Sequence, residues 1–314
     1  MKWLKYIVVP VALVLVAVVG FAHLAPQVTM DALFVAERSQ GSLVRKTITL
    51  EGGEHFAYLE GGKGEPLVLI HGFGGNKDNF TRVAKRFTSR YHVIIPDLMG
   101  FGESSRPPKA DYSPAAQAER LHRLVAALGA GNGVHIGGNS MGGHISMAWA
   151  SLYPQEVKSM WLLDPGGVWS APKSELILNY EATGQMPLIT STEEEFLELT
   201  KWAMNKPPFV PEVLMRAMAH ENIPHVALLT RILTTISQDP IEPKLNGVTT
   251  PTLLVWGEKD RLLSVKSVPV LQKLLPQAKV IIMKDIGHIP MLEDDAQAAA
   301  DYLAFRDQLA KAAP

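Results

Sequence analysis

Residues 135–144 read HIGGNSMGGH and carry one serine, Ser140, with a pair of glycines on each side. Glycine is favoured where the backbone takes unusual dihedral angles or passes close to another group. The five residues centred on Ser140 match the pattern G-x-S-x-G, in which a strand leads into the serine and a helix leads away from it. An apolar run at 134–136 and a helical pattern at 141–153 supply that context. The stretch therefore predicts a sharp turn that displays the Ser140 hydroxyl as a nucleophile.

Short apolar runs alternate with helical patterns along most of the chain. Residues 43–50 and 55–60 predict an antiparallel pair of strands at the start. Nearly continuous apolar runs, which are typical of parallel strands covered on both faces, follow at 66–70, 92–96, 134–136, 160–164, 252–256 and 279–283. Helical patterns separate them at 77–89, 114–128, 141–153, 267–275 and 293–310. This alternation predicts a doubly wound α/β fold with a mostly parallel sheet.

One interval, residues 166–249, interrupts the alternation. It holds no strand-like run, only helical patterns broken by prolines. An insertion of this length between two strands predicts a helical cap over the carboxyl edge of the sheet, where open α/β sheets keep their sites. The core then consists of residues 41–165 and 250–314. The many apolar side chains of the cap, methionines among them, either fill its own core or line a substrate pocket.

The first segment, residues 1–30, is set apart from this fold. Lys2 and Lys5 precede residues 6–30, which contain no Asp, Glu, Lys or Arg. As a helix, this stretch would reach roughly 37 Å, enough to cross a bilayer core of about 30 Å. The lysines before it predict a membrane anchor with a cytoplasmic N-terminus and an exported catalytic domain on the non-cytoplasmic side. The alternative is a signal peptide cleaved near residues 20–22, which would give a secreted protein.

Composition excludes several classes of function. The formal net charge is −1 and the sequence pI is near 6.8, so long-range attraction to nucleic acid is absent. The chain contains no cysteine, which excludes disulfides, a thiolate nucleophile and a Cys-ligated metal. A dinucleotide-binding G-x-G-x-x-G that begins at Gly72 fails because position 77 is lysine. We expect no cofactor and no metal.

A serine nucleophile needs a base and an acid that orients the base, and this kind of fold supplies them in the order Ser, Asp/Glu, His. His288 lies just after the last predicted strand, at the carboxyl edge of the sheet. Asp260 lies four residues beyond the end of the preceding strand, at the same edge. We therefore expect Ser140, Asp260 and His288 to form a catalytic triad. Asp164, at the end of the run 160–164, is the alternative acid.

Acyl transfer also needs two backbone N–H donors that stabilise the oxyanion of the tetrahedral intermediate. The N–H of Met141, directly after the nucleophile, is one candidate. The second should come from the loop after the run 66–70, which reads His-Gly-Phe-Gly-Gly-Asn. Its glycines leave the backbone free to turn the amide of Phe73 inward. We expect the oxyanion hole to consist of the N–H groups of Phe73 and Met141.

Five motifs taken together, HGFGG, PDLMGFGESSRP, GNSMGGH, WGEKD and IGHIPMLED, resemble the α/β-hydrolase superfamily in order over residues 41–310. Within it, the N-terminal segment, GNSMGG and LLDPGG are similar to membrane-associated bacterial lipases/esterases and to monoacylglycerol lipases. The resemblance implies a serine hydrolase whose partner is a small-molecule acyl ester. It also implies that Asp97, Gly100 and Gly102 form a structural loop.

Two other functions stay open at this point. The serine motif also resembles carbon–carbon bond hydrolases of meta-cleavage products, although these usually carry Trp after the catalytic Gly-His, where this chain has Ile289. A membrane-tethered binding protein on an inactive hydrolase scaffold is the third possibility, against which the complete Ser, Asp, His order argues. Branches of the superfamily with an Asp nucleophile are disfavoured because Ser140 occupies that position.

Overall fold

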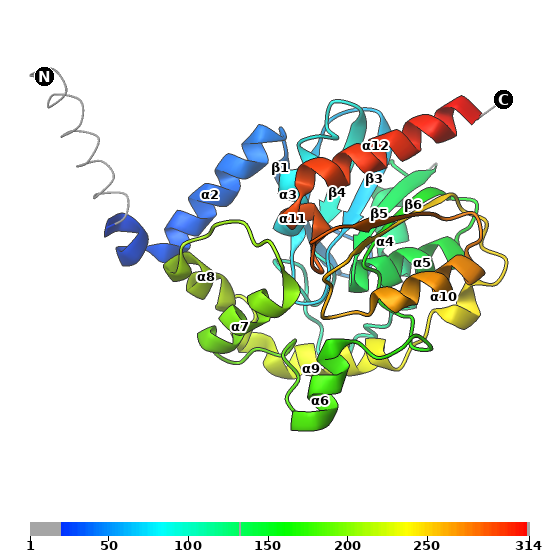
Figure 1. Ribbon diagram of the computed structural model, residues 1–314. Helices are drawn as coiled ribbons and strands as arrows, with labels where there is room; N and C mark the ends of the chain where they lie inside the picture. The colour runs from blue at the N-terminus through cyan, green and yellow to red at the C-terminus, as the bar shows by residue number, and fades with distance from the viewer. Residues whose placement is uncertain (1–19, 132, 313–314) are drawn as a thin grey trace, which may run out of the picture.

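The computed structural model describes residues 20–131 and 133–312, and the structural statements below concern these residues. They form a central sheet with helices on both faces (Figure 1). The strands are β1 Val44–Thr49, β2 His55–Gly61, β3 Glu65–Ile70, β4 Tyr91–Pro96, β5 Val134–Asn139, β6 Val157–Leu163, β7 Thr252–Gly257 and β8 Lys279–Met283. Their order in the sheet is β1-β2-β4-β3-β5-β6-β7-β8.

The sheet is mostly parallel, as predicted. β1 pairs with β2 and β2 with β4 in antiparallel orientation, and every later pair in the sheet order is parallel. β5 extends further than the apolar run 134–136, because Gly137 and Gly138 continue the pairing with β6. This extension carries the chain to the sheet edge directly before Ser140. The doubly wound α/β fold is therefore confirmed.

Helices cover the two faces of the sheet and fill the long insertion. They are α2 Pro26–Gln40, α3 Thr81–Ala84, α4 Pro114–Ala127, α5 Met141–Leu152, α6 Glu175–Thr183, α7 Glu193–Ala203, α8 Glu212–Ala219, α9 Val226–Ser237, α10 Val268–Leu274, α11 Pro290–Glu293 and α12 Asp295–Ala312. Short 3-10 turns are η1 Lys77–Phe80, η2 Ile223–His225, η3 Glu242–Leu245 and η4 Val265–Ser267. The helix predicted at 77–89 is shorter than expected: η1 and α3 together span residues 77–84.

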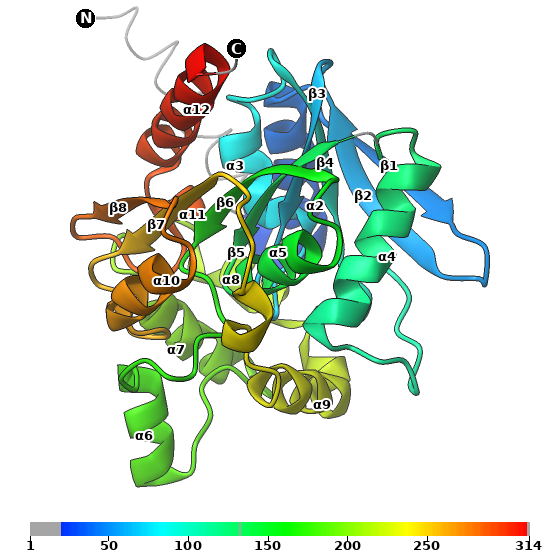
Figure 2. The same cartoon turned by 90° about the vertical axis from the view of Figure 1, so that its right-hand side faces the viewer.

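Two apolar cores lie on opposite faces of the sheet. Figure 2 shows the helices that cover these faces. One includes Leu121 of α4 and Trp149 of α5, and the other includes Val83 of α3 and Tyr302 of α12, all fully buried. Burial of such side chains is the main favourable contribution to folding. The two cores hold the sheet rigidly between its helices, which fixes the loops at the strand ends.

Helices α6 to α9 all lie in the interval between β6 and β7 for which the sequence predicted a cap. In Figure 1 they gather at one end of the sheet. α2 lies beside α8, and Met30 of α2 is buried against Leu214 and Ala217 of α8. The far end of α2 is held by Arg38, whose guanidinium donates to the Asp78 carboxylate at 2.5 and 2.6 Å.

Most of the predicted anchor, residues 1–19, lies outside the described residues. The segment that the sequence set apart, residues 1–30, ends inside α2, whose buried Met30 belongs to the folded part. Within residues 20–131 and 133–312, none of the helices has the length and apolarity that crossing a bilayer requires.

Candidate active site

Ser140 occupies a sharp turn between β5 and α5. Its backbone angles are φ 56° and ψ −118°, in the left-handed half of φ space that side chains rarely adopt. The turn is held on both sides: the N–H of Ser140 donates to the carbonyl of Leu163 at 3.0 Å, and its own carbonyl accepts from Gly166 at 2.9 Å. Such strain persists only where the surroundings determine it, and it is common at active sites. The predicted sharp turn between a strand and a helix is therefore present, and the role of the Ser140 hydroxyl as a nucleophile stays a prediction.

Two glycines of the motif are required by the space around the turn. A Cβ atom on Gly142 would lie 2.1 Å from the carbonyl oxygen of Ile70, which belongs to the backbone of β3. A Cβ atom on Gly138 would lie 2.2 Å from the carbonyl oxygen of Gly142. Both neighbours are backbone atoms, one of β3 and one of α5, so neither can move away without displacing a strand or a helix.

His288 and Asp260 meet at the same edge of the sheet. Nδ1 of His288 lies 2.8 Å from Oδ2 of Asp260. The other carboxylate oxygen, Oδ1, accepts the N–H groups of Leu262 and Leu263 at 2.8 and 3.0 Å. Because an ionised carboxylate only accepts, Nδ1 is the donor, and Nε2 of the imidazole keeps its lone pair. That is the tautomer in which a histidine can take a proton from a serine.

Ser140 and His288 line one cavity of about 580 Å³. Phe73 lines it as well, as do many apolar side chains of the cap and of α2. Among these are Leu176, Leu188, Phe196 and Met204 from the cap, and Met30, Leu33 and Phe34 from α2. A mostly apolar cavity with a few polar groups at one place is typical of a site for a small organic ligand.

The loop after β3 adjoins the serine, since a Cβ atom on Gly72 would lie 3.2 Å from Cβ of Ser140. His71, fully buried, fixes this loop: Nδ1 donates to the carbonyl of Gly72 at 2.8 Å, and Nε2 accepts the N–H of Leu98 at 3.0 Å. Burial lowers the pKa of His71, so its imidazole is neutral, as this bonding requires. The N–H of Met141, the first residue of α5, has no acceptor within its own helix.

Residues 65–295 match the family described as the alpha/beta hydrolase fold. The protein belongs to the α/β-hydrolase family. It is 46% identical over 290 residues to Lipase 3 of Moraxella sp. (strain TA144), a match that covers 90% of this chain and 91% of that protein. It is 27% identical to monoacylglycerol lipase ABHD6 of Rattus norvegicus over 76% of this chain and 75% of that protein.

Solved structures agree with the assignment of this α/β-hydrolase. The crystal structure of a membrane phospholipase A, described as a novel bacterial virulence factor, has a TM-score of 0.85 and 37% sequence identity. The match covers 98% of this chain and 99% of that chain. The resemblance read from the five sequence motifs is therefore confirmed.

Two of the other histidines after the serine, His144 and His220, have their contacts elsewhere in this α/β-hydrolase. His144 is buried in α5, and burial lowers its pKa to about 4. His220 lies in the cap with Nε2 2.7 Å from Oε1 of Glu193. Neither contacts Asp260 or Asp164, whereas His288 does contact Asp260.

Sequence reasoning missed the carboxylate that holds the His288 loop. Glu293, in α11, accepts the N–H of Gly287 at 3.0 Å and those of Asn205 and Lys206 at 2.8 and 2.7 Å. In addition, the N–H of His288 donates to the carbonyl of Ala203, the last residue of α7, at 2.7 Å. Glu293 stands in the motif IGHIPMLED, but its role depends on where the cap docks, which local sequence does not reveal.

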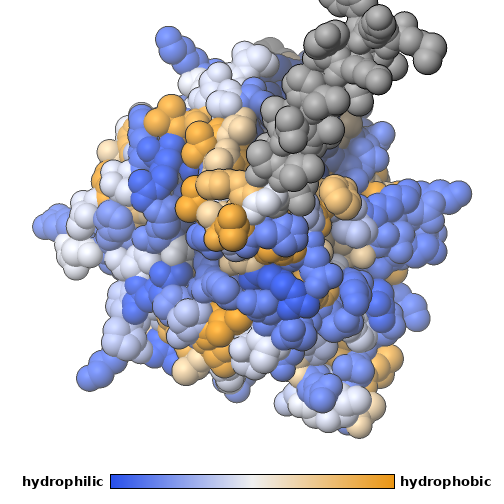
Figure 3. Space-filling view, turned by 90° about the vertical axis from the view of Figure 1, so that its left-hand side faces the viewer, coloured by the Kyte–Doolittle hydropathy of each residue, from blue (hydrophilic) through white to orange (hydrophobic). Residues whose placement is uncertain are grey.

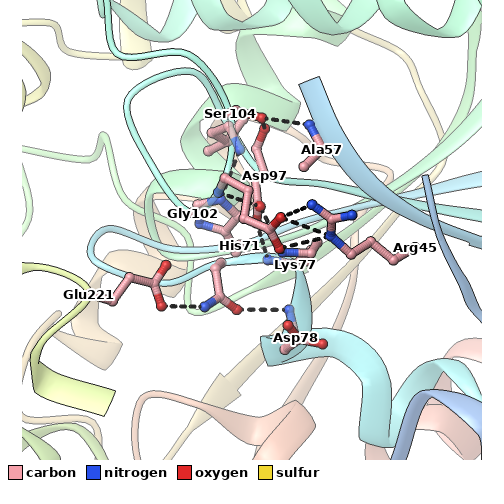
Figure 4. Close-up of polar contacts among 12 residues, drawn as sticks. Arg45, Ala57, His71, Lys77, Asp78, Asp97, Gly102, Ser104 and Glu221 are labelled. Carbon is pink, nitrogen blue, oxygen red and sulfur yellow. Dashed lines mark hydrogen bonds and ion pairs between the residues drawn. The ribbon is translucent and has the colours of Figure 1, made fainter. Parts of the chain in front are cut away.

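A buried ion pair lies beneath the loop that carries Phe73 (Figure 4). Nζ of Lys77 lies 2.9 Å from Oδ2 of Asp97, and their side chains are 3% and 0% exposed. Nζ also contacts Glu103 at 2.8 Å, and Glu103 in turn binds Arg45 at the surface. Asp97 also accepts the backbone N–H groups of Lys77 and Glu103. The predicted structural role of Asp97 agrees with this geometry.

The cap contacts the same loop through two neighbouring residues, of which Figure 4 shows Glu221. Oε2 of Glu221 accepts from Nδ2 of Asn76 at 2.7 Å. Nδ2 of Asn222 donates to the carbonyl of Gly74 at 2.6 Å. Burial raises the pKa of Glu221 to about 6, and Asp97 adds to this effect. Such contacts between cap and core are not readable from sequence spacing.

Asp164, the alternative acid, stands beside the Asp260–His288 pair. It follows β6 with φ 45° and is fully buried. Oδ1 accepts the N–H of Gly257 at 2.8 Å. The hydrogen bond of the imidazole goes to Asp260, and the carboxyl group of Asp164 lies within 4.8 Å of both partners.

Proposed function

We propose that this α/β-hydrolase is a serine hydrolase that cleaves carboxylic esters through an acyl-enzyme. One observation carries the proposal: the strained Ser140 and His288, which is hydrogen-bonded to Asp260, line a single, mostly apolar cavity. The resemblance to proteins named lipases supports the same reaction class.

In the proposed mechanism, Oγ of Ser140 attacks the ester carbonyl while Nε2 of His288 takes its proton. The oxyanion accepts hydrogen bonds from the N–H groups of Phe73 and Met141. His288 then returns the proton to the departing alcohol, and a water molecule hydrolyses the acyl-enzyme by the same route. Asp260 holds the imidazole in its tautomer and stabilises the imidazolium. Every step uses side chains and amides of this chain, so no metal or cofactor is invoked.

The substrate we propose is a lipid-like acyl ester of the monoacylglycerol type. The cavity volume of about 580 Å³ accommodates a long acyl chain, and its cap and α2 walls supply aliphatic and aromatic side chains. Methionines such as Met204 adapt to chains of different length. A panel of p-nitrophenyl esters, monoglycerides, triglycerides and a meta-cleavage product should give turnover with the esters. Turnover with the meta-cleavage product alone would favour the carbon–carbon hydrolase.

We also propose that the protein is exported and held at a membrane through its N-terminal segment. Hydrophobic side chains are exposed on the face that carries α2 and α8, next to the start of the described chain (Figure 3). Leu24 and Phe209, for example, are 88% and 92% exposed. Full-length protein should fractionate with membranes and resist extraction by high salt. A mature N-terminus near residues 21–23, read by Edman sequencing, would instead indicate a cleaved signal peptide.

The nucleophile is tested by Ser140→Ala with purified, folded protein. Loss of a serine nucleophile lowers turnover by about 10⁶-fold in a comparable triad. We expect a loss of that order and loss of labelling by a fluorophosphonate probe. Ser146→Ala is the matched control, since this hydroxyl lies in α5, six residues after Ser140, and donates to the carbonyl of Gly142 at 2.7 Å. A Ser140→Ala enzyme that keeps a tenth of the wild-type rate would refute the proposal.

A further inference from the structure

The carboxyl group of Asp164 has no role in the mechanism above, although it is buried beside it. Its nearest elements are β6, which it ends, and β7, whose Gly257 donates an N–H to Oδ1 at 2.8 Å. The second oxygen, Oδ2, is buried and has no hydrogen-bond partner among the described residues. Ligand atoms of Asp164, Asp260 and His288 all lie within 4.8 Å of one another.

Two ionised carboxylates at this separation in a buried place repel each other strongly, so one of the two holds a proton. Asp260 already accepts two backbone N–H groups and the imidazole, all of which favour its charged form. Asp164 accepts a single backbone N–H. The proton therefore belongs on Asp164, and the free oxygen Oδ2 is its place.

We propose that Asp164 is protonated in the resting enzyme and donates a hydrogen bond from Oδ2 to the carboxylate of Asp260, so that the two carboxyl groups present one negative charge to His288. The inference rests on the proposed serine-hydrolase function and assigns Asp164 as a positioning residue of that site. A proton turns a repulsive contact between two carboxyl groups into an attractive one and satisfies the buried Oδ2.

The charged groups around Asp164 agree with this assignment. Burial raises the pKa of Asp164 well above its usual range, and Asp260 and Glu293 add to the effect, while the N–H of Gly257 opposes it. In the Asp164, Asp260 and His288 cluster, His288 is the member that becomes cationic during turnover, and it is hydrogen-bonded to Asp260. Burial and the neighbouring carboxylates therefore outweigh the single N–H of Gly257 and disfavour a second negative charge.

Conservative replacement separates a neutral donor from a charge. In Asp164→Asn, the amide oxygen still accepts the N–H of Gly257 and the NH₂ group still donates to Asp260. Asparagine also tolerates the positive φ of this position. We expect Asp164→Asn to keep at least about a third of kcat/KM, whereas Asp164→Gly, which fits the backbone but removes the donor, should lower kcat at least about tenfold with KM little changed.

The pH profile of kcat/KM distinguishes a charged Asp164 from a neutral one, which a purely structural effect of the residue would not do. An ionised Asp164 within a few ångströms would add a second negative charge beside the imidazolium of His288, so its removal would move the acid limb of kcat/KM to lower pH by about one unit or more. We expect the limb of Asp164→Asn to shift by less than about 0.3 unit. Asp285→Asn is the matched control, since it removes an exposed carboxylate three residues from His288 at a backbone position that also has positive φ.

The Asp260→Asn background gives the sharpest contrast. There Asp164 loses its charged neighbour, ionises and stabilises the imidazolium. Asp260→Asn should lower kcat by about 10⁴-fold, as the corresponding change does in a serine protease. Adding Asp164→Asn should lower it at least about tenfold further, far more than on the wild-type background.

An infrared measurement tests the proton without using activity. At pH 8, full-length wild-type protein should show the C=O stretch of a protonated carboxyl group, and Asp164→Asn should lack it. Absence of that band in the wild type, or an acid limb lowered by one unit in Asp164→Asn, would overturn the proposal. Equal effects of Asp164→Asn on both backgrounds would do so as well. Failure of the serine mechanism itself appears separately, as activity retained by Ser140→Ala.

Discussion

Replacing Lys77 with methionine should test how far the buried ion pair beneath the Phe73 loop supports the fold. Lys77 is 3% exposed and Asp97 is fully buried, so water cannot replace a missing partner. Burial alone would lower the pKa of Lys77, but Asp97 and Glu103 outweigh it and the pKa is raised. Lys77→Met keeps an unbranched apolar side chain of nearly the same length and removes the ammonium group that donates to Asp97 and Glu103.

The cost follows from what is left behind. Removing one partner of a buried pair typically destabilises a protein by about 3–5 kcal/mol, because the other charge stays buried. Asp97 keeps the N–H groups of residues 77 and 103, at 2.7 and 2.8 Å, which compensate in part. We therefore expect Lys77→Met to lower the free energy of unfolding by about 3 kcal/mol, at the lower end of that range.

Urea denaturation of the full-length protein at pH 7, followed by tryptophan fluorescence, measures the change. Lys173→Met is the control, since Lys173 and Glu181 form a pair with side chains 56% and 47% exposed. It should cost less than about 1 kcal/mol. The double variant Lys77→Met/Asp97→Asn should lose less free energy of unfolding than the sum of the losses of the two single variants, by at least about 1 kcal/mol. A Lys77→Met loss equal to that of the control would refute the reasoning.

Two further changes follow from the same site. Burial raises the pKa of Glu221 to about 6, so the folded state holds this proton more tightly than the unfolded state does. The free energy of unfolding therefore falls as the pH rises from about 4.5 to about 6. Glu221→Gln should therefore raise the free energy of unfolding by at most about 2 kcal/mol at pH 7 and leave it unchanged below pH 4.5. Tm measured against pH tests this, and an effect that does not depend on pH would contradict it. Gly142→Ala should lower kcat more than about tenfold, because its Cβ meets the Ile70 carbonyl at 2.1 Å, whereas Gly166→Ala, with its nearest atom at 3.5 Å, should not; equal effects would show that the turn tolerates a side chain.

The positions of Asp260 and His288 were predictable because parallel strands end at one edge of a sheet. Once the strands 252–256 and 279–283 were recognised, the residues after them had to lie near the end of β5 and Ser140. The helix at 77–89 was predicted too long because its apolar pattern continues past Ala84. There the chain must turn back into β4, and Thr88 packs closely against Gly62, whose Cβ would meet its carbonyl oxygen at 2.5 Å.

The supports of the site were not predictable in the same way. Glu221 and Asn222 act through Asn76 and Gly74, which are about 145 residues away in the chain. No local periodicity encodes how a cap docks. The start of α2 was hidden for another reason: the apolar composition of residues 6–30 runs through Pro26, which is the first residue of the helix. Proline at that place is a helix-start signal that the uniform apolarity masked.

The backbone hydrogen bonds between the end of α7 and the loop before α11 constrain any attempt to change substrate preference by exchanging caps. Ala203, Asn205 and Lys206 belong to the insertion, yet their backbone groups bind His288 and Glu293 of the core. A transplanted cap that displaced these residues by an ångström would shift the general base as well as the pocket wall. Cap exchange should therefore move residues 203–206 and 285–293 together, as one cassette, while α6, α8 and α9 can vary around them.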